Sequence, residues 1–134
     1  MPALPAPDSK PVVLVVDDEP LIRMNIADAI DTAGLQVLEA CDADEALHLL
    51  ETQPRIDILL SDVRMPGSMD GAALAKVALS RWPSLRVLVM SGHAAGSGLA
   101  DGVTFLPKPF PLPVLIDQLG KFTERPQAMA SLRR

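Results

Sequence analysis

The chain has 134 residues, of which 49% are hydrophobic and 22% charged, and this is enough apolar material for the core of one domain. Its net charge of −5 at pH 7 argues against a domain-wide nucleic-acid-binding surface, which would be basic. No apolar run reaches the roughly 18 residues of a membrane-spanning helix, and the start of the chain lacks the apolar centre of a signal peptide. Cys41 is the single cysteine, which excludes an internal disulfide, so we expect a cytoplasmic protein.

Hydrophobic patterns predict five strands in alternation with helices. The strands are expected at residues 12–16, 35–40, 57–61, 85–90 and 103–106. Helices are expected at about residues 19–33, 42–52, 71–81 and 111–120, each beginning beside an acid or Pro that favours a helix start. Most of the strands are apolar runs, as in a sheet covered on both faces, whereas 35–40 alternates and suits an edge. The alternation predicts a doubly wound parallel α/β sheet with helices on both faces.

Further expectations concern the first helix and the extent of the folded domain. In the first helix, one inward face is expected from the spacing of five apolar residues: Ile22, Ile26, Ala29, Ile30 and Ala33. Residues 1–10 are expected to be a flexible lead-in, residues 11–122 the folded domain, and residues 123–134 a C-terminal tail.

The weakest unit is the crossover between the fourth and fifth strands. Residues 92–102 include four glycines, and each Gly inside a helix costs about 1 kcal/mol relative to Ala. We therefore expect the fourth of five possible helices to be short or disordered.

Polar side chains follow the carboxyl ends of four predicted strands. Asp17 and Asp18 follow the first strand, Asp62 the third, Ser91 the fourth, and Lys108 lies just beyond the fifth. Since parallel strands place their carboxyl ends at one edge of a sheet, we expect these five side chains to lie close together.

Three carboxylates at one edge would repel one another by about 3 kcal/mol per pair at roughly 5 Å and an effective dielectric constant of about 20. Either one of them takes up a proton, or a cation lies among them. Carboxylate and carbonyl oxygens suit Mg²⁺, and the sequence gathers no His or Cys cluster of the kind that Zn²⁺ prefers. A carboxylate beside such a cation can attack phosphorus, and an ammonium group can neutralise the phosphoryl oxygens.

Five short segments together resemble the receiver domain of two-component response regulators. They are Asp17-Asp18, Asp62-Val63-Arg64-Met65-Pro66, Met69-Asp70-Gly71, Ser91-Gly92 and Phe105-Leu106-Pro107-Lys108-Pro109-Phe110. The resemblance covers residues 11–122 and implies a flavodoxin-like sheet with five parallel strands in the order 2-1-3-4-5.

For the reaction, the resemblance implies that Asp62 accepts a phosphoryl group from a histidine kinase or a histidine phosphotransfer protein. Asp17, Asp18, Asp62 and the backbone carbonyl of Arg64 would hold Mg²⁺. The domain would be a signalling switch that catalyses its own phosphorylation and dephosphorylation rather than an enzyme with a separate substrate.

For the response, the resemblance implies that Ser91 and Lys108 bind the phosphoryl group. Ser91 and Phe105 would form a switch pair, in which a hydroxyl moves toward phosphate and an aromatic ring turns inward. The change would alter binding to a downstream protein, and no direct contact with nucleic acid or membrane is expected.

Two other functions fit parts of the pattern. One is a Mg²⁺-dependent phosphohydrolase with Asp62 as nucleophile, although such enzymes of the haloacid dehalogenase type need an acid where Arg64 stands. The other is a flavin-binding module, whose loop after the first strand would carry hydroxyls and Gly instead of three acids. The simplest alternative is that the acids at residues 17–19 only cap the first helix.

Overall fold

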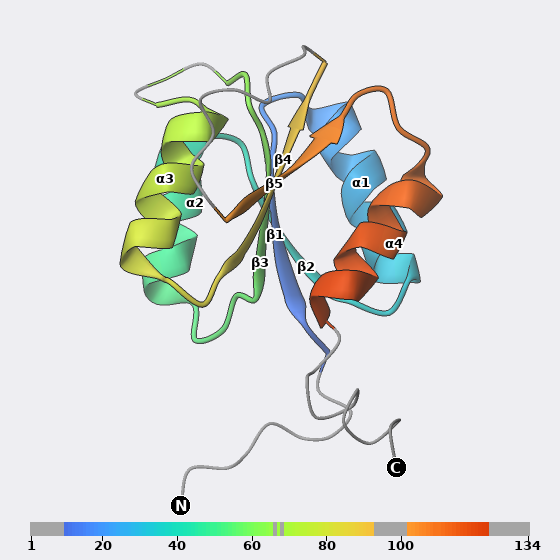
Figure 1. The fold of residues 1–134 in the computed structure, drawn as a ribbon, viewed down its shortest axis with the longest axis horizontal. Helices are drawn as coiled ribbons and strands as arrows, with labels where there is room; N and C mark the ends of the chain where they lie inside the picture. The colour runs from blue at the N-terminus through green and yellow to red at the C-terminus, as the bar shows by residue number, and fades with distance from the viewer. Residues whose placement is uncertain (1–9, 66, 68, 93–101, 124–134) are drawn as a thin grey trace, which may run out of the picture.

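The sheet has the predicted topology. A computed structural model describes residues 10–65, 67, 69–92 and 102–123. Its strands are β1 (Val12–Val16), β2 (Gln36–Ala40), β3 (Ile58–Asp62), β4 (Arg86–Ser91) and β5 (Val103–Pro107). All neighbouring strands are parallel, in the order β2-β1-β3-β4-β5, which confirms the predicted doubly wound, flavodoxin-like sheet (Figure 1).

Helices cover both faces of the sheet. They are α1 (Pro20–Thr32), α2 (Ala43–Thr52), α3 (Gly71–Arg81) and α4 (Leu112–Thr123). In Figure 1, α2 and α3 lie on one side of the sheet and α1 and α4 on the other. The predictions of a short or disordered helix before β5, a flexible lead-in and a C-terminal tail fall largely on residues 93–101, 1–9 and 124–134, outside the described part.

Strand alternation divides the core into two layers. On β1, Leu14 packs with the cluster under α2 and α3, whereas Val13 and Val15 pack with the cluster under α1 and α4. All of β1 is buried, while β2 is partly exposed and lies at the edge, as its alternating sequence predicted. None of the helices in the described ranges is long and apolar enough to cross a membrane.

The predicted inward face of α1 is wrong at both of its ends. Ile26 and Ile30 are buried and Ala29 is partly buried, but Ile22 is 37% exposed and Ala33 is exposed, while Ala27 is buried. Positions four apart in a helix drift by about 40° per step, so Ile22 lies about 80° around the helix from Ile30. The buried stripe therefore passes beside Ile22 and leaves it at the surface.

Gly71 brings the start of α3 against the end of β3. A Cβ atom at Gly71 would collide with the backbone carbonyl of Asp62 and crowd the Ser61 hydroxyl. The amide of Gly71 donates a 2.8 Å hydrogen bond to the carbonyl of Val63, and Asp70 caps the helix by accepting from the amide of Ala73 at 2.9 Å. Only a residue without a side chain allows this close approach.

We predict that Gly71→Ala lowers the free energy of unfolding by about 1 to 3 kcal/mol, as overpacking does in tight interiors. The matched control is Gly120→Ala within α4, where an added Cβ meets no atom within 4 Å. That change should be neutral or stabilising, by up to about 1 kcal/mol. Urea unfolding measures both effects, and equal stability of the two variants would contradict the close approach.

Candidate functional site

Three carboxylates meet at the carboxyl edge of the sheet. Asp17 and Asp18 follow β1, and Asp62 is the last residue of the neighbouring strand β3. One oxygen from each lies within 4.8 Å of the others. This is the juxtaposition that the strand ends predicted.

Asp17 is the most deeply buried of the three acids. It is fully buried, and its Oδ1 accepts a 2.9 Å hydrogen bond from the amide of Glu19. Its Oδ2 is buried and has no hydrogen-bond partner among the described residues. Burial raises the pKa of Asp17 above 3.8, and the negative charge of Asp62 raises it further, while the Glu19 amide opposes both. No hydrogen-bond donor in the described structure contacts this oxygen, and the positive charge of Lys108 offsets the rise in the pKa of Asp17 only in part.

Asp62 contacts a cation and an amide. The ammonium of Lys108 lies 3.0 Å from its Oδ2, and the amide of Arg64 donates to its Oδ1 at 3.2 Å. The Asp62 and Lys108 side chains are only 15% and 26% exposed, so solvent screens this pair less than an ordinary surface pair. Lys108 is held near β4, because its amide donates a 2.7 Å hydrogen bond to the carbonyl of Ser91.

The structure also places the remaining predicted residues. Ser91 is buried at the end of β4, one residue beyond Met90, which is the register partner of Asp62. Phe105 is partly buried in β5 beside Val89, two positions before the level of Ser91. Ser91 therefore lies at the same edge as the acids, whereas Phe105 lies two residues further back along the sheet.

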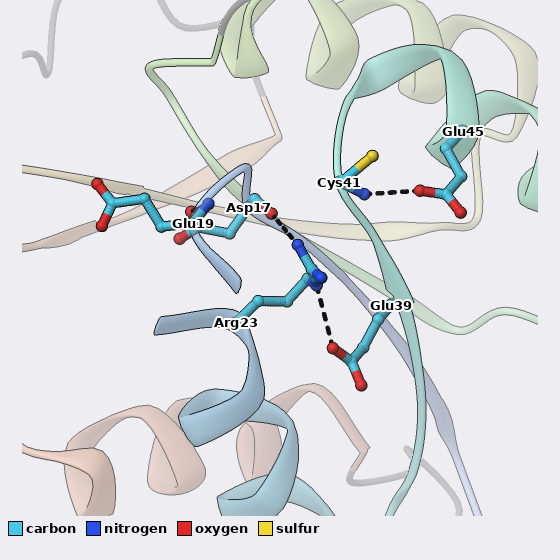
Figure 2. Close-up of polar contacts among 6 residues, drawn as sticks. All are labelled: Asp17, Glu19, Arg23, Glu39, Cys41 and Glu45. Atoms are coloured by element: carbon cyan, nitrogen blue, oxygen red, sulfur yellow. Dashed lines mark hydrogen bonds and ion pairs between the residues drawn. The ribbon is translucent and has the colours of Figure 1, made fainter. Parts of the chain in front are cut away.

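Sequence reasoning missed two groups that support the site. The hydroxyl of Ser61 donates to the backbone carbonyl of Asp62 at 2.9 Å, and Arg23 of α1 donates to the backbone carbonyl of Asp17 at 2.7 Å (Figure 2). Ser61 follows a buried run and could have been predicted to face α3 from strand alternation. Arg23 lies in an ordinary amphipathic helix, and no motif marks it.

Beside the acids the surface forms an open hollow. Asp18, Arg64, Met65 and Asp70 line it, so it is bounded by the loop after β1 and the loop after β3. A small solute can therefore reach the acid cluster from this side.

Comparison with known proteins identifies the family. The family model of the response regulator receiver domain matches residues 13–120. The chain is 41% identical over 104 residues to the DNA-binding transcriptional regulator NtrC of Klebsiella pneumoniae, covering 74% of this chain and 22% of that protein. The crystal structure of the receiver domain from the hybrid histidine kinase CckA matches with a TM-score of 0.72 at 37% identity, over 84% of this chain and 99% of that one.

A third similar protein is the response regulator TrrA from Thermotoga maritima, whose crystal structure was determined in complex with Mg²⁺ and BeF. It matches with a TM-score of 0.76 at 25% identity, over 84% of this chain and 98% of that chain. This chain belongs to the family of response regulator receiver domains, the phosphoacceptor domains of two-component signalling. It spans about a fifth of the length of the NtrC proteins that it matches.

Since the pKa of Asp17 is raised in the folded state, its ionisation destabilises the fold. This loss in the free energy of unfolding is absent at pH values below the ordinary pKa of 3.8. It grows as the pH rises from there through the raised pKa of the folded state, and it is constant at higher pH. We predict that Asp17→Asn, which keeps an acceptor for Glu19, raises the urea midpoint of the metal-free protein at pH 7. The gain should shrink as pH falls toward about 4.

The control for this titration is Asp28→Asn, a change at an exposed position of α1. It should leave the urea midpoint nearly unchanged at each pH. A gain for Asp17→Asn that is the same at every pH, or a loss of stability at pH 7, would contradict the assignment of an uncompensated buried charge.

Proposed function

We propose that Asp62 is the phosphoacceptor and that residues 11–122 form the switching unit. The observation that carries the proposal is the convergence on Asp62 of an ammonium at 3.0 Å and two further carboxylates within 4.8 Å. Carboxylates alone would repel a phosphoryl group, and an ammonium alone would bind it without reacting. Together they suit phosphorylation of a carboxylate: Asp62 is the nucleophile, and the ammonium of Lys108 binds the phosphoryl group that it attacks.

The donor set fits Mg²⁺. Asp17, Asp18, Asp62 and the backbone carbonyl of Arg64 would supply hard oxygen ligands. The buried Oδ2 of Asp17, which has no partner in the described part of the chain, supports this fit because a cation would compensate its charge. The ion, when bound, would neutralise negative charge on the phosphoryl oxygens. The similarity to TrrA, which was crystallised with Mg²⁺ and BeF, supports the same interpretation.

The chain's own residues would then act in sequence. An oxygen of Asp62 attacks the phosphorus of a phosphohistidine, the P–N bond breaks, and the imidazole leaves with its electron pair. Lys108 contacts the Asp62 carboxylate in the unphosphorylated structure, and after phosphorylation its ammonium would turn toward a phosphoryl oxygen. Attack by water on the same phosphorus breaks its bond to the Asp62 oxygen, releases inorganic phosphate and restores the Asp62 carboxylate. The same residues would thus serve phosphorylation and dephosphorylation, and the domain would act as its own phosphatase.

The response would be transmitted through Ser91 and Phe105. The Ser91 hydroxyl would donate to the phosphoryl group, and the space that it leaves would admit the partly exposed ring of Phe105. Such a movement shifts the population between two packings of β4 and β5. The altered surface would change the affinity for a downstream protein.

The phosphodonor would dock on the α1 and α4 side. A groove beside Lys108 is lined by Ile22, Ile26, Phe110 and Leu112, among others. The large apolar side chains that are exposed in the described structure all belong to these two helices: Leu21, Ile22, Met24, Leu112 and Val114. An apolar surface next to a reactive group is a common feature of protein docking sites. We infer that a histidine kinase or a histidine phosphotransfer protein covers it.

We predict that acetyl phosphate and Mg²⁺ add one phosphoryl group to the wild-type protein and none to Asp62→Asn. The amide is isosteric with the carboxylate but is not a nucleophile toward phosphorus. Intact-mass spectrometry measures the addition, with EDTA as the metal-free control. The variant Asp31→Asn, at an exposed position of α1, should be labelled as the wild type is. Full labelling of Asp62→Asn would refute the assignment of the phosphoacceptor.

We also predict that Leu21→Glu slows phosphotransfer from a phosphorylated histidine protein at least about tenfold, because Leu21 is 75% exposed and a buried charge there would be unpaired. Labelling by acetyl phosphate should not change, since a small donor needs no docking surface. The control is Ser80→Glu on α3, which adds the same charge on the opposite face. Equal rates for the two variants with the protein donor would show that donors dock elsewhere.

A further inference from the structure

Arg23 connects three elements next to the acid cluster. Its Nη1 donates a 2.7 Å hydrogen bond to the backbone carbonyl of Asp17, and its Nε donates at 3.0 Å to Oε1 of Glu39 in β2. Its own amide donates to the carbonyl of Glu19, within the first turn of α1. Figure 2 shows the guanidinium between Asp17 and Glu39. The Arg23 side chain is only 17% exposed, so packing restricts it to this position.

The carbonyl that Arg23 holds belongs to the peptide group between Asp17 and Asp18. A peptide group is planar, and the Cα atoms of both of its residues lie in that plane. One hydrogen bond to this oxygen therefore orients the two Cα atoms from which both carboxylates project. No other single contact described in the structure can act on Asp17 and Asp18 together in this way.

The other hydrogen bonds of the loop do not fix the orientation of the peptide group between Asp17 and Asp18. The amide of Asp17 donates to the carbonyl of Ala40 at 3.1 Å, which extends the pairing of β1 and β2 by one residue. The carboxylate of Asp17 accepts from the amide of Glu19 at 2.9 Å. These bonds fix the amide side of Asp17 and its side chain. The Arg23 contact is the one that fixes the carbonyl side, toward Asp18.

The contribution of Arg23 is geometric rather than electrostatic. Glu39 forms an ion pair with the same guanidinium, so its negative charge offsets the positive charge that Arg23 would otherwise exert on the three acids. The two contacts also need two separate N–H groups in a fixed fork, which Arg has and Lys lacks. A Lys at position 23 would keep the charge but could not hold Glu39 and the Asp17 carbonyl with the same geometry.

We propose that Arg23 is a positioning residue for Mg²⁺ binding, acting through the peptide group that joins Asp17 and Asp18. The inference rests on the proposed function, because it assumes that these two carboxylates bind Mg²⁺. Groups that orient metal ligands by hydrogen bonds, without touching the metal themselves, typically contribute about 10-fold to 100-fold in metal affinity. Arg23 belongs to this class, although it acts on the backbone between two ligands and not on a ligand side chain.

The test compares Mg²⁺ binding by calorimetry with Mg²⁺-dependent labelling by acetyl phosphate. Arg23→Ala should raise the Kd for Mg²⁺ about tenfold, and Arg23→Lys should raise it nearly as much. The half-saturating Mg²⁺ concentration for labelling should rise by the same factor. At saturating Mg²⁺ the labelling rate should return to within about twofold of wild type, because the ion itself then orders the loop. Glu39→Gln, which keeps an acceptor for Nε, should leave the Kd within about twofold.

The matched control is Arg81→Ala, which removes the exposed 2.8 Å pair with Glu51 far from the acids and should leave Mg²⁺ binding unchanged. If Arg23→Ala does not fold, as judged by circular dichroism, Arg23→Lys decides the question. Full recovery of Mg²⁺ affinity in Arg23→Lys would overturn the proposal and favour a charge effect. An unchanged Kd in Arg23→Ala would also overturn it. A wild-type protein that binds no Mg²⁺ would instead refute the proposed function.

Discussion

The crowding of Asp17, Asp18 and Asp62 within 4.8 Å is the constraint on which the rest of the site depends. Like charges at this separation repel by about 3 kcal/mol per pair at an effective dielectric constant of about 20. The fold does not remove this repulsion. Lys108 pairs with Asp62 and only partly offsets the charge of Asp17, whose buried Oδ2 has no hydrogen-bond partner in the described structure. The metal-free site is therefore destabilised in a way that a divalent cation would relieve, and this links stability to ligand binding.

The surrounding framework can hold the acids together because it is rigid where they attach. β1 is buried along its whole length, and β3 is buried up to its last residue. Gly71 lets α3 contact the backbone at the end of β3, and Arg23 contacts the backbone just after β1. Each contact is to a carbonyl group, so the positions of the carboxylates are set through the main chain. A loop held only by side chains would relax away from the repulsion.

The candidate reactive groups and the exposed apolar surface lie on different parts of the fold. The acids, Lys108 and Ser91 lie at the edge of the sheet, whereas the exposed apolar side chains lie on α1 and α4 beside that edge. Ile22 belongs to both regions, since it is exposed on α1 and lines the groove that reaches Lys108. Under the proposed function, a protein donor would bind to the helices while its phosphoryl group reaches Asp62. Changes on the helices would then alter the choice of donor without changing the reaction itself.

The sequence by itself determined the alternation of strands and helices, the edge position of β2, and the meeting of Asp17, Asp18 and Asp62, because periodicity and strand ends are local properties. The strand order came from resemblance to a known family. Only the tertiary structure decided the 3.0 Å contact of Lys108 with Asp62, which joins residues 46 apart, and the contact of Arg23 with a backbone carbonyl. Such contacts depend on the register of β3 with its neighbours and on the rotation of each helix. A local pattern defines neither. Ile22 shows the effect: positions four residues apart drift by about 40° around the helix, and this drift leaves Ile22 exposed.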